Sequence, residues 1–267
     1  MLDIIIITHN AKSYLRRCLQ SITEKVKGID YRIIVVDNGS ADGTREMILN
    51  EFPDIVLIAN RYNKGVAPAR NQGIRVSRSK YLLLLDADTE TTEHAIETLL
   101  EFMESHPSIG VVGPKLVSHA GILQYSCRRF PRLITTIYRR LDFLPFVAHS
   151  QILREHHMSG WNHGYPQPVD YIIGACQAIR RKALVDVGLL DEKIFYGPED
   201  IDFCLRMWLK HWQVYYYPRA VVIHHEQRMT KRNPFSIVAL RHCTALGYLF
   251  TKYRFNLTKH LPQRRLT

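Results

Sequence analysis

The chain has 267 residues, 46% of them hydrophobic and 23% charged, a balance typical of a globular protein and not of a disordered one. The formal net charge of +11 calls for an anionic partner, such as nucleic acid, a membrane surface or a phosphorylated substrate. The five cysteines form no Cys-x-x-Cys pair, which argues against a zinc site or a disulfide framework. The sequence has no signal-peptide pattern and no apolar run of roughly 18 residues, so we expect a cytoplasmic protein.

The first part of the chain alternates between apolar runs and segments with helical spacing. β-Branched runs at 2–10 and 31–39 end in polar side chains, and a third apolar run covers 54–59. A helix from about Pro68 to Val76 leads into a fourth run at 80–88. Because such strands are too apolar for one face to meet water, the pattern predicts an α/β fold. Its central sheet is expected to be mostly parallel, with helices on both faces.

The fourth run carries the strongest chemical signal. Leu82–Leu85 form a strand expected to be buried on both faces, and Asp86 and Asp88 follow it. Residues two apart in an extended chain point the same way, so the two carboxylates are expected side by side. A divalent cation that also holds a phosphate would relieve their repulsion. The alternative is a solvated strand end before a helix that Thr91 and Thr92 would cap.

Polar side chains also end the other strands of this half. In parallel α/β sheets ligands bind at the carboxyl ends of the strands, and the residues expected there are Thr8, His9, Asn10, Asp37, Asn38, Asp86 and Asp88. Asp37 suits a ribose hydroxyl or a nucleobase donor, although it could simply form a turn. Neither Gly-x-Gly-x-x-Gly nor a Walker-type loop is present, so the carboxylate pair is the candidate for holding a phosphate-rich ligand.

The regular alternation stops after residue 114. Residues 115–168 are irregular and rich in basic and aromatic side chains, and we interpret them as an insertion or lid. Its apolar surface either faces a membrane or packs on the sheet. Another buried strand is expected at 171–176.

Two later segments carry further candidates. Glu199, Asp200 and Asp202 crowd the first turn of a helix that starts at Pro198. They would stabilise the helix dipole, which would also keep one of them ionised as a base. A His-His pair beginning at His224 ends a late apolar strand, and a neutral imidazole can complete a metal shell.

The end of the chain is amphipathic and basic over residues 235–255, with further basic residues beyond. It could lie on an anionic bilayer or form a packed terminal helix with a solvated tail.

In this order and spacing, the segments resemble the family-2 glycosyltransferases with a GT-A fold over nearly the whole chain. Within that family the sequence looks most like the bacterial rhamnosyltransferase-like enzymes of cell-surface polysaccharide assembly, on Arg129–Pro131 and Glu199–Asp202. Pro68 departs from the pattern, which puts the detail of its loop in doubt. The matching segments are Thr8–Asn10, Val35–Thr44, Asn63–Gly65, Arg70–Gly73, Asp86–Asp88, Ile173–Cys176, Glu199–Arg206 and His224.

The resemblance implies a single-displacement, inverting transfer from a dTDP- or UDP-sugar that depends on Mg²⁺ or Mn²⁺. It implies Asp88 and His224 as metal ligands, Asp200 as general base, and Gly174 as a point of close sugar approach. Asp86, followed by Ala87, would contact the ribose or the metal. The residues implied to line the nucleoside pocket are Thr8, Asn10, Asp37, Asn63 and Asn71.

The expected organisation has three parts. Residues 1–114 would bind the nucleotide-sugar, residues 115–232 would form the acceptor-side and catalytic half of the same domain, and residues 233–267 a helical, membrane-associated tail. The expected partners are the donor, a lipid-linked or glycan acceptor and the inner face of the cell membrane. Self-association is left open, and nucleic acid is not expected. Two alternatives remain: a non-catalytic protein that binds nucleic acid or an anionic surface, and a nucleotidyltransferase, although its glycine-rich basic loop is missing.

Overall fold

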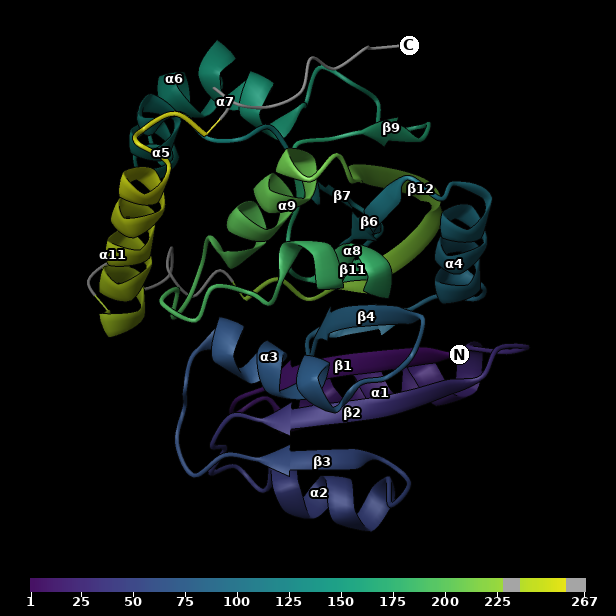
Figure 1. The fold of residues 1–267 in the computed structure, drawn as a ribbon. Helices are drawn as coiled ribbons and strands as arrows, with labels where there is room; N and C mark the ends of the chain where they lie inside the picture. Colours follow the sequence, from purple (N-terminus) through teal and green to yellow (C-terminus); the bar gives the residue numbers. More distant parts are fainter. Residues whose placement is uncertain (228–235, 258–267) are drawn as a thin grey trace.

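The computed structural model describes residues 1–227 and 236–257, in which one large sheet is covered by helices (Figure 1). The strands are β1 (Leu2–Thr8), β2 (Tyr31–Asp37), β3 (Val56–Ala59), β4 (Tyr81–Asp86), β5 (Thr89–Thr91), β6 (Ile109–Val117), β7 (Leu123–Gln124), β8 (Cys127–Arg128), β9 (Gln167–Pro168), β10 (Tyr171–Ile172), β11 (Cys176–Arg180) and β12 (Gln213–His224). The helices are α1 (Lys12–Lys25), α2 (Thr44–Glu51), α3 (Val66–Val76), α4 (Ala95–Ser105), α5 (Leu133–Arg140), α6 (Pro145–Ala148), α7 (Gln151–His157), α8 (Arg181–Val187), α9 (Glu199–Leu209) and α11 (Ile237–Lys252).

The strand order in the sheet is β3-β2-β1-β4-β11-β6-β12-β5. The first four strands are all parallel, and β6 pairs with β12 in parallel as well. β11 runs antiparallel between β4 and β6 and so joins the two halves of the sheet. The predicted α/β fold with a mostly parallel central sheet is confirmed, and its antiparallel pairs lie in the second half.

Helices cover both faces of the sheet because its strands are apolar on both. Alternate residues of β1 enter different cores: Ile4 packs with α1, α2 and α4, and Ile5 packs with α3, α8 and α9. The four leucines Leu82–Leu85 are each at most 1% exposed. Burying such a side chain contributes about 1.5–3 kcal/mol, so this strand fixes its own register and the position of Asp86 at its end.

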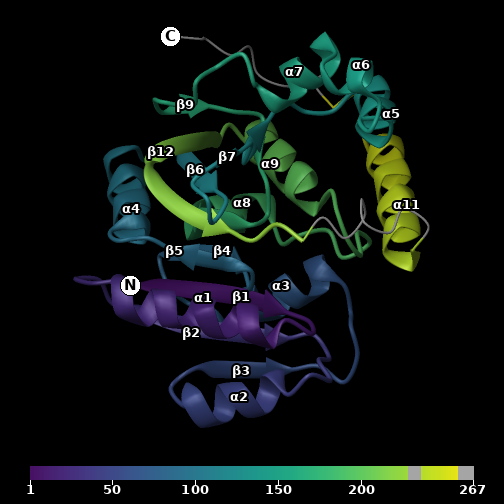
Figure 2. The ribbon, with the colours of Figure 1, turned by 180° about the vertical axis from the view of Figure 1, so that it is seen from behind.

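The C-terminal helix α11 lies beside α5 at one edge of the molecule (Figures 1 and 2). Arg140 joins them, since its Nη2 donates to the Ala239 carbonyl at 3.5 Å. At its other end, α11 contacts α9 through an ion pair between Lys252 and Asp202. The expected C-terminal helix is therefore present and packed on the domain. Part of the predicted tail, 228–235 and 258–267, lies outside the described residues. Within the described ranges, no helix is long and apolar enough to cross a bilayer.

Three local expectations need correction. The run 171–176 is two short strands, because the chain turns around Gly174. Thr91 and Thr92 do not cap α4: its N-cap is His94, Thr91 belongs to β5, and Thr92 donates to the Val221 carbonyl. The span 115–168, expected to be irregular, contains α5, α6 and α7. Thr91 failed as a predicted cap because a long-range strand pairing outweighs a local capping preference.

Candidate active site

A buried arginine lies at the centre of the site. Arg70, on α3, is 2% exposed and donates from Nη2 to Asp86 Oδ1 at 2.6 Å and to the Gly174 carbonyl at 2.7 Å. Its Nη1 donates to Glu199 Oε1 at 3.1 Å. One guanidinium thus joins the end of β4, the turn before β11 and the start of α9. Charge-assisted hydrogen bonds of this kind are about twice as strong as neutral ones.

The two aspartates after β4 have different surroundings. The strand ends at Asp86, and the chain turns at Ala87 and Asp88, so the predicted extended arrangement is wrong. Arg70 compensates Asp86, whereas burial and the nearby Asp86 charge raise the pKa of Asp88 to about 7. The repulsion between the two carboxylates that the sequence predicts therefore appears as a raised pKa of Asp88.

His224 faces Asp88, with 3.6 Å between its Nε2 and Asp88 Oδ1. Gln124 orients the ring: its Nε2 donates to the His224 carbonyl at 2.9 Å, and its Oε1 lies 2.8 Å from Nδ1. An amide oxygen only accepts, so Nδ1 carries the proton and Nε2 keeps its lone pair. Burial also lowers the pKa of His224, which favours the neutral ring.

This donor set fits a divalent cation. A carboxylate oxygen and an imidazole lone pair face each other at 3.6 Å, too far apart for a hydrogen bond. A metal-binding histidine usually donates its other N–H to an oxygen, as His224 does to Gln124. Within 1–227 and 236–257, no cluster of three or more His, Cys, Asp or Glu side chains suited to a metal is found. Mg²⁺ is commonly held by one or two carboxylates together with substrate phosphates. The Asp88 carboxylate matches that pattern, whereas an imidazole ligand such as His224 is more typical of transition metals.

Asp200 lies in the first turn of α9, where its Oδ2 accepts from the Gly174 N–H at 3.1 Å and its Oδ1 from the Ile201 N–H at 2.7 Å. Its pKa is raised by burial, which outweighs these bonds and the Arg70 charge. Burial also raises the pKa of its neighbour Glu199, whose carboxylate Arg70 holds. Asp200 is half-buried and so combines a raised pKa with access, as a general base requires.

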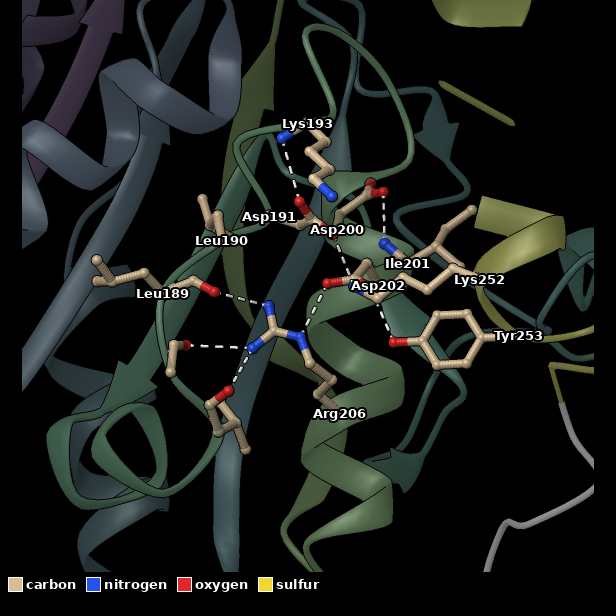
Figure 3. Close-up of polar contacts among 12 residues, drawn as sticks. Leu189, Leu190, Asp191, Lys193, Asp200, Ile201, Asp202, Arg206, Lys252 and Tyr253 are labelled. Atoms are coloured by element: carbon tan, nitrogen blue, oxygen red, sulfur yellow. Dashed lines mark hydrogen bonds and ion pairs between the residues drawn. The ribbon is translucent and has the colours of Figure 1, made fainter. Parts of the chain in front are cut away.

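Asp202 is a structural residue in this arrangement. It is fully buried and accepts from Arg206 Nε at 2.8 Å, Lys252 Nζ at 2.5 Å and the Tyr253 hydroxyl at 2.8 Å. Figure 3 shows Asp202 between Arg206 and Tyr253, while the carboxylate of Asp200 points away from this group. Of the three acidic residues in the first turn, Asp202 ties α9 to α11, and the other two face the Arg70 network.

The residues expected to line the nucleoside pocket mostly collect at the ends of β1, β2 and β3. Thr8 and Asp37 are register partners, and Asn10 Oδ1 accepts from the Ala41 N–H at 2.8 Å. Asn63 Oδ1 accepts from Asn38 Nδ2 at 3.0 Å, which joins the loop after β3 to the end of β2. Within the described chain, the buried Thr8 hydroxyl has no hydrogen-bond partner. Contact of these residues with a nucleoside stays a prediction.

Two of the predicted site residues, Asn71 and Gly174, contact other parts of the protein. Asn71 is fully buried, and its amide is bonded to Leu190 and Glu192, so it anchors the loop before α9. At Gly174 an added Cβ would lie 2.5 Å from Arg70 Nη1. The close approach that this glycine permits is therefore to a protein guanidinium. Asn71 and Arg70 are adjacent in sequence, and only Arg70 points at the acidic cluster.

Sequence reasoning gave no role to Arg70 or Gln124. Arg70 stood inside a matching segment, and its partners Glu199 and Gly174 are 129 and 104 residues away. Gln124 is 100 residues from His224. The available signal was indirect: Asp86 and Asp88 follow a fully apolar strand, and buried charges are paired, so a cation was to be expected near them.

Comparison with known proteins identifies the family of the chain. The model of Glycosyl transferase family 2 matches residues 3–188, more than half of the chain. The chain belongs to glycosyltransferase family 2. Its expected enzyme class is thereby confirmed, and the nucleotidyltransferase and nucleic-acid-binding alternatives are set aside.

Two curated relatives extend over most of this chain. An N-acetylglucosaminyl-diphospho-decaprenol L-rhamnosyltransferase of Mycobacterium tuberculosis is 25% identical over 95% of this chain and 85% of its own length. A low-salt glycan biosynthesis hexosyltransferase of Haloferax volcanii is 26% identical over 76% of this chain and 61% of its own. The resemblance to rhamnosyltransferase-like enzymes is thus confirmed as a similarity.

A solved structure with a similar fold is a mannosyltransferase from Pyrobaculum calidifontis in complex with GDP-Man and Mn²⁺. It aligns with a TM-score of 0.65 and 18% identity, covering 98% of this chain and 65% of that one. At this identity the match confirms the GT-A fold.

Proposed function

We propose that the protein is an inverting, metal-dependent glycosyltransferase. In this proposal it transfers rhamnose or a related sugar from a dTDP- or UDP-sugar to a hydroxyl of a lipid-linked or polysaccharide acceptor. The observation that carries the proposal is the Arg70 network, which brings the Asp86–Asp88 turn and the Glu199–Asp200 turn to one place. The similarity to the mycobacterial rhamnosyltransferase favours the sugar and the lipid-linked acceptor.

Asp200 is the proposed general base. Two backbone N–H groups hold its carboxylate, and burial raises its pKa toward the value at which a base is most effective near neutral pH. It would remove the proton from the attacking hydroxyl while the bond between the sugar and the nucleoside diphosphate breaks. A direct displacement of this kind inverts the anomeric centre and needs no nucleophile from the protein.

Asp88 and His224 are the proposed ligands of Mg²⁺ or Mn²⁺. When bound, the cation would stabilise the negative charge of the leaving diphosphate. Gln124 holds the His224 ring in the tautomer that ligation requires. Arg70 fixes Asp86 beside the pair, where that carboxylate is available to a ribose hydroxyl or to the cation.

The proposed location is the inner face of the cell membrane, with α5, α6 and α11 toward the bilayer. We call the exposed apolar residues of this edge the α5–α11 surface: Leu133, Ile134, Ile137, Leu141, Phe143, Phe146, Ile237 and Leu240. The exposed side chains of Arg132 and Arg241 border it. Apolar residues flanked by cations suit an anionic lipid surface, in agreement with the net charge of +11.

Transfer of radiolabelled sugar tests the proposal, with dTDP- and UDP-sugars as donors and a lipid-diphosphate glycan as acceptor. Loss of a general base typically costs ~10²–10⁴-fold, so Asp200→Asn should reduce transfer by that range and leave donor binding intact. Glu199→Gln is the matched control, because it removes the neighbouring carboxylate of the same turn. Full turnover of Asp200→Asn, or a retained anomeric configuration in the product, would refute the mechanism.

A further inference from the structure

A second group of ionisable residues lies near Asp200. It consists of Arg128 on β8, Arg139 on α5, His156 on α7 and Tyr171 on β10. Arg128 and Tyr171 are register partners in the antiparallel pair β8–β10, so their side chains share one face of that small sheet. The Tyr171 and His156 rings are 6.3 Å apart between centroids. The proposed transfer mechanism gives no role to any of these four residues.

Both guanidiniums act on Asp200. Gly174, whose N–H binds Asp200, follows Tyr171 by three residues, and Arg128 lowers the pKa of the Asp200 carboxyl against the larger effect of burial. Arg139 is within electrostatic reach of Asp200 as well. Burial and the neighbouring Arg128 nevertheless lower the pKa of Arg139, because they outweigh the carboxylates around it. The group therefore places two guanidiniums and a buried imidazole near the proposed base.

The arginines and the imidazole of the group differ in their partners. Arg128 donates from Nε to the Tyr125 carbonyl at 3.3 Å, and the carboxylates that act on Arg139 are Asp200 and Asp142. His156 is 2% exposed, and neither of its ring nitrogens has a partner there. Burial, aided by Arg139, lowers the pKa of His156 to about 2, so the ring is neutral and keeps one N–H to donate. Buried polar groups without partners cost free energy, which an anionic ligand with several acceptor oxygens would recover.

Helix α5 carries both Arg139 and several exposed apolar residues. At 100° per residue, Leu133, Ile134, Ile137 and Leu141 occupy one side of the helix, and Arg139 lies roughly opposite them. The apolar residues are exposed, whereas Arg139 is half-buried and within electrostatic reach of Arg128. One short helix thus presents apolar side chains outward and a cation inward to the proposed base.

We propose that Arg128 and Arg139, with His156 as an additional donor, bind a phosphoryl group carried by the acceptor. This proposal rests on the proposed transferase function and specifies its acceptor: a sugar attached through phosphate or diphosphate to a lipid. The phosphoryl group would lie between the two guanidiniums, the acceptor hydroxyl would reach Asp200, and the lipid would leave along the α5–α11 surface. The donor diphosphate is assigned separately to Asp88 and His224.

A pair of matched acceptors tests the proposal, namely a glycan on a short-chain lipid diphosphate and the same glycan as a neutral alkyl glycoside. A hydrogen bond to a charged group contributes about 1.5–3 kcal/mol. Arg139→Gln and Arg128→Gln should therefore raise the KM of the diphosphate acceptor by roughly 10–100-fold. The KM values of the neutral acceptor and of the donor should not change, and Arg139→Lys should recover part of the loss. Arg154→Gln is the control, because Arg154 lies on α7, the helix that carries His156, and is exposed.

Each other outcome overturns the proposal. An equal loss with both acceptors would mean that the arginines only tune Asp200, and a raised donor KM would assign them to the donor diphosphate. Unchanged kinetics would leave them structural. Calorimetric binding of inorganic pyrophosphate in EDTA gives a readout without turnover: Arg139→Gln should weaken it at least about tenfold and Arg154→Gln should not. If the wild-type protein transfers no sugar but shows this pattern, the proposed function fails while the anion site stands.

Discussion

Replacement of Arg70 by methionine would test whether one buried cation holds the site together. Methionine keeps much of the apolar length of the side chain but removes the bonds to Asp86, Glu199 and the Gly174 carbonyl. Glu199 is 5% exposed and would be left as a buried, uncompensated carboxylate. Removing one partner of a buried ion pair costs about 3–5 kcal/mol, a large part of the 5–15 kcal/mol typical of a domain.

Urea unfolding followed by circular dichroism measures that loss directly. Arg70→Met should lower the free energy of unfolding by about 3–5 kcal/mol with an unchanged m-value. The double variant Arg70→Met/Glu199→Gln should recover at least about 1 kcal/mol, since it removes the charge that has lost its partner. Glu199→Gln alone should cost less than Arg70→Met, because burial already raises the pKa of Glu199 and brings it closer to the neutral form.

The pH dependence of the Arg70→Met deficit has a definite sign. Without the guanidinium, the folded-state pKa of Glu199 rises further above its unfolded value of about 4.3. The native state then binds more protons than the unfolded state, so stability falls as pH rises. Burial already raises the pKa of Glu199 to about 8 in the wild type, so the difference between variant and wild type should be nearly constant at lower pH and grow above about pH 8. A loss below about 1 kcal/mol, or a deficit independent of pH, would refute the role of Arg70 as the compensating charge.

Three further variants each test one contribution: the orientation of a metal ligand, the docking of α11 on α9, and the buried carboxylate of Asp3 on β1. Gln124→Leu should weaken Mn²⁺ binding roughly 10–100-fold, measured by calorimetry with the donor nucleotide present, because it frees the His224 ring; unchanged affinity would contradict the assigned tautomer. Asp202→Asn should lower the free energy of unfolding by about 3–5 kcal/mol while donor binding is retained, and a selective loss of turnover would instead make it catalytic. Asp3→Asn should cost roughly 2–4 kcal/mol at pH 7. Asp3 accepts hydrogen bonds from Arg32, Ser77, Arg78 and Ser79, which together outweigh burial and lower the pKa of its carboxyl group. The difference in unfolding free energy between Asp3→Asn and wild type should therefore close as pH falls below about 4.

The N-terminal half of the fold could be predicted because its information is local. The runs that became β1, β2 and β4 are apolar and short, and each ends in a polar residue at the carboxyl edge of the sheet. Parallel pairing then brings Thr8 and Asp37 together without further information. The second half was harder to predict because its order depends on distant pairing. β12 is one strand of 12 residues, although its sequence is interrupted by Pro218, where the register with β6 shifts.

The same distinction between local and long-range information applies to the candidate site. Asp88, His224 and Asp200 could be named from motif residues, although their contacts with ligands stay predictions. The helix α3 shows the limit of such reasoning: Asn71 was expected to face the ligand, whereas Arg70 faces the acidic cluster. Adjacent helical residues point about 100° apart, and the sequence alone does not fix which of them faces inward.

The placement of Arg70 also explains why two adjacent carboxylates can serve different ends. Two positive charges are needed to compensate Asp86 and Asp88. The protein itself provides one of them, the Arg70 guanidinium on α3, which forms an ion pair with Asp86. Asp88 is left with a raised pKa and a neutral imidazole opposite. In the proposed mechanism the second charge arrives with the donor, as the cation on its diphosphate. Because Arg70 also holds Glu199 beside Asp200, the same guanidinium fixes the distance between the donor's cation and the base, which a transfer without a covalent intermediate requires.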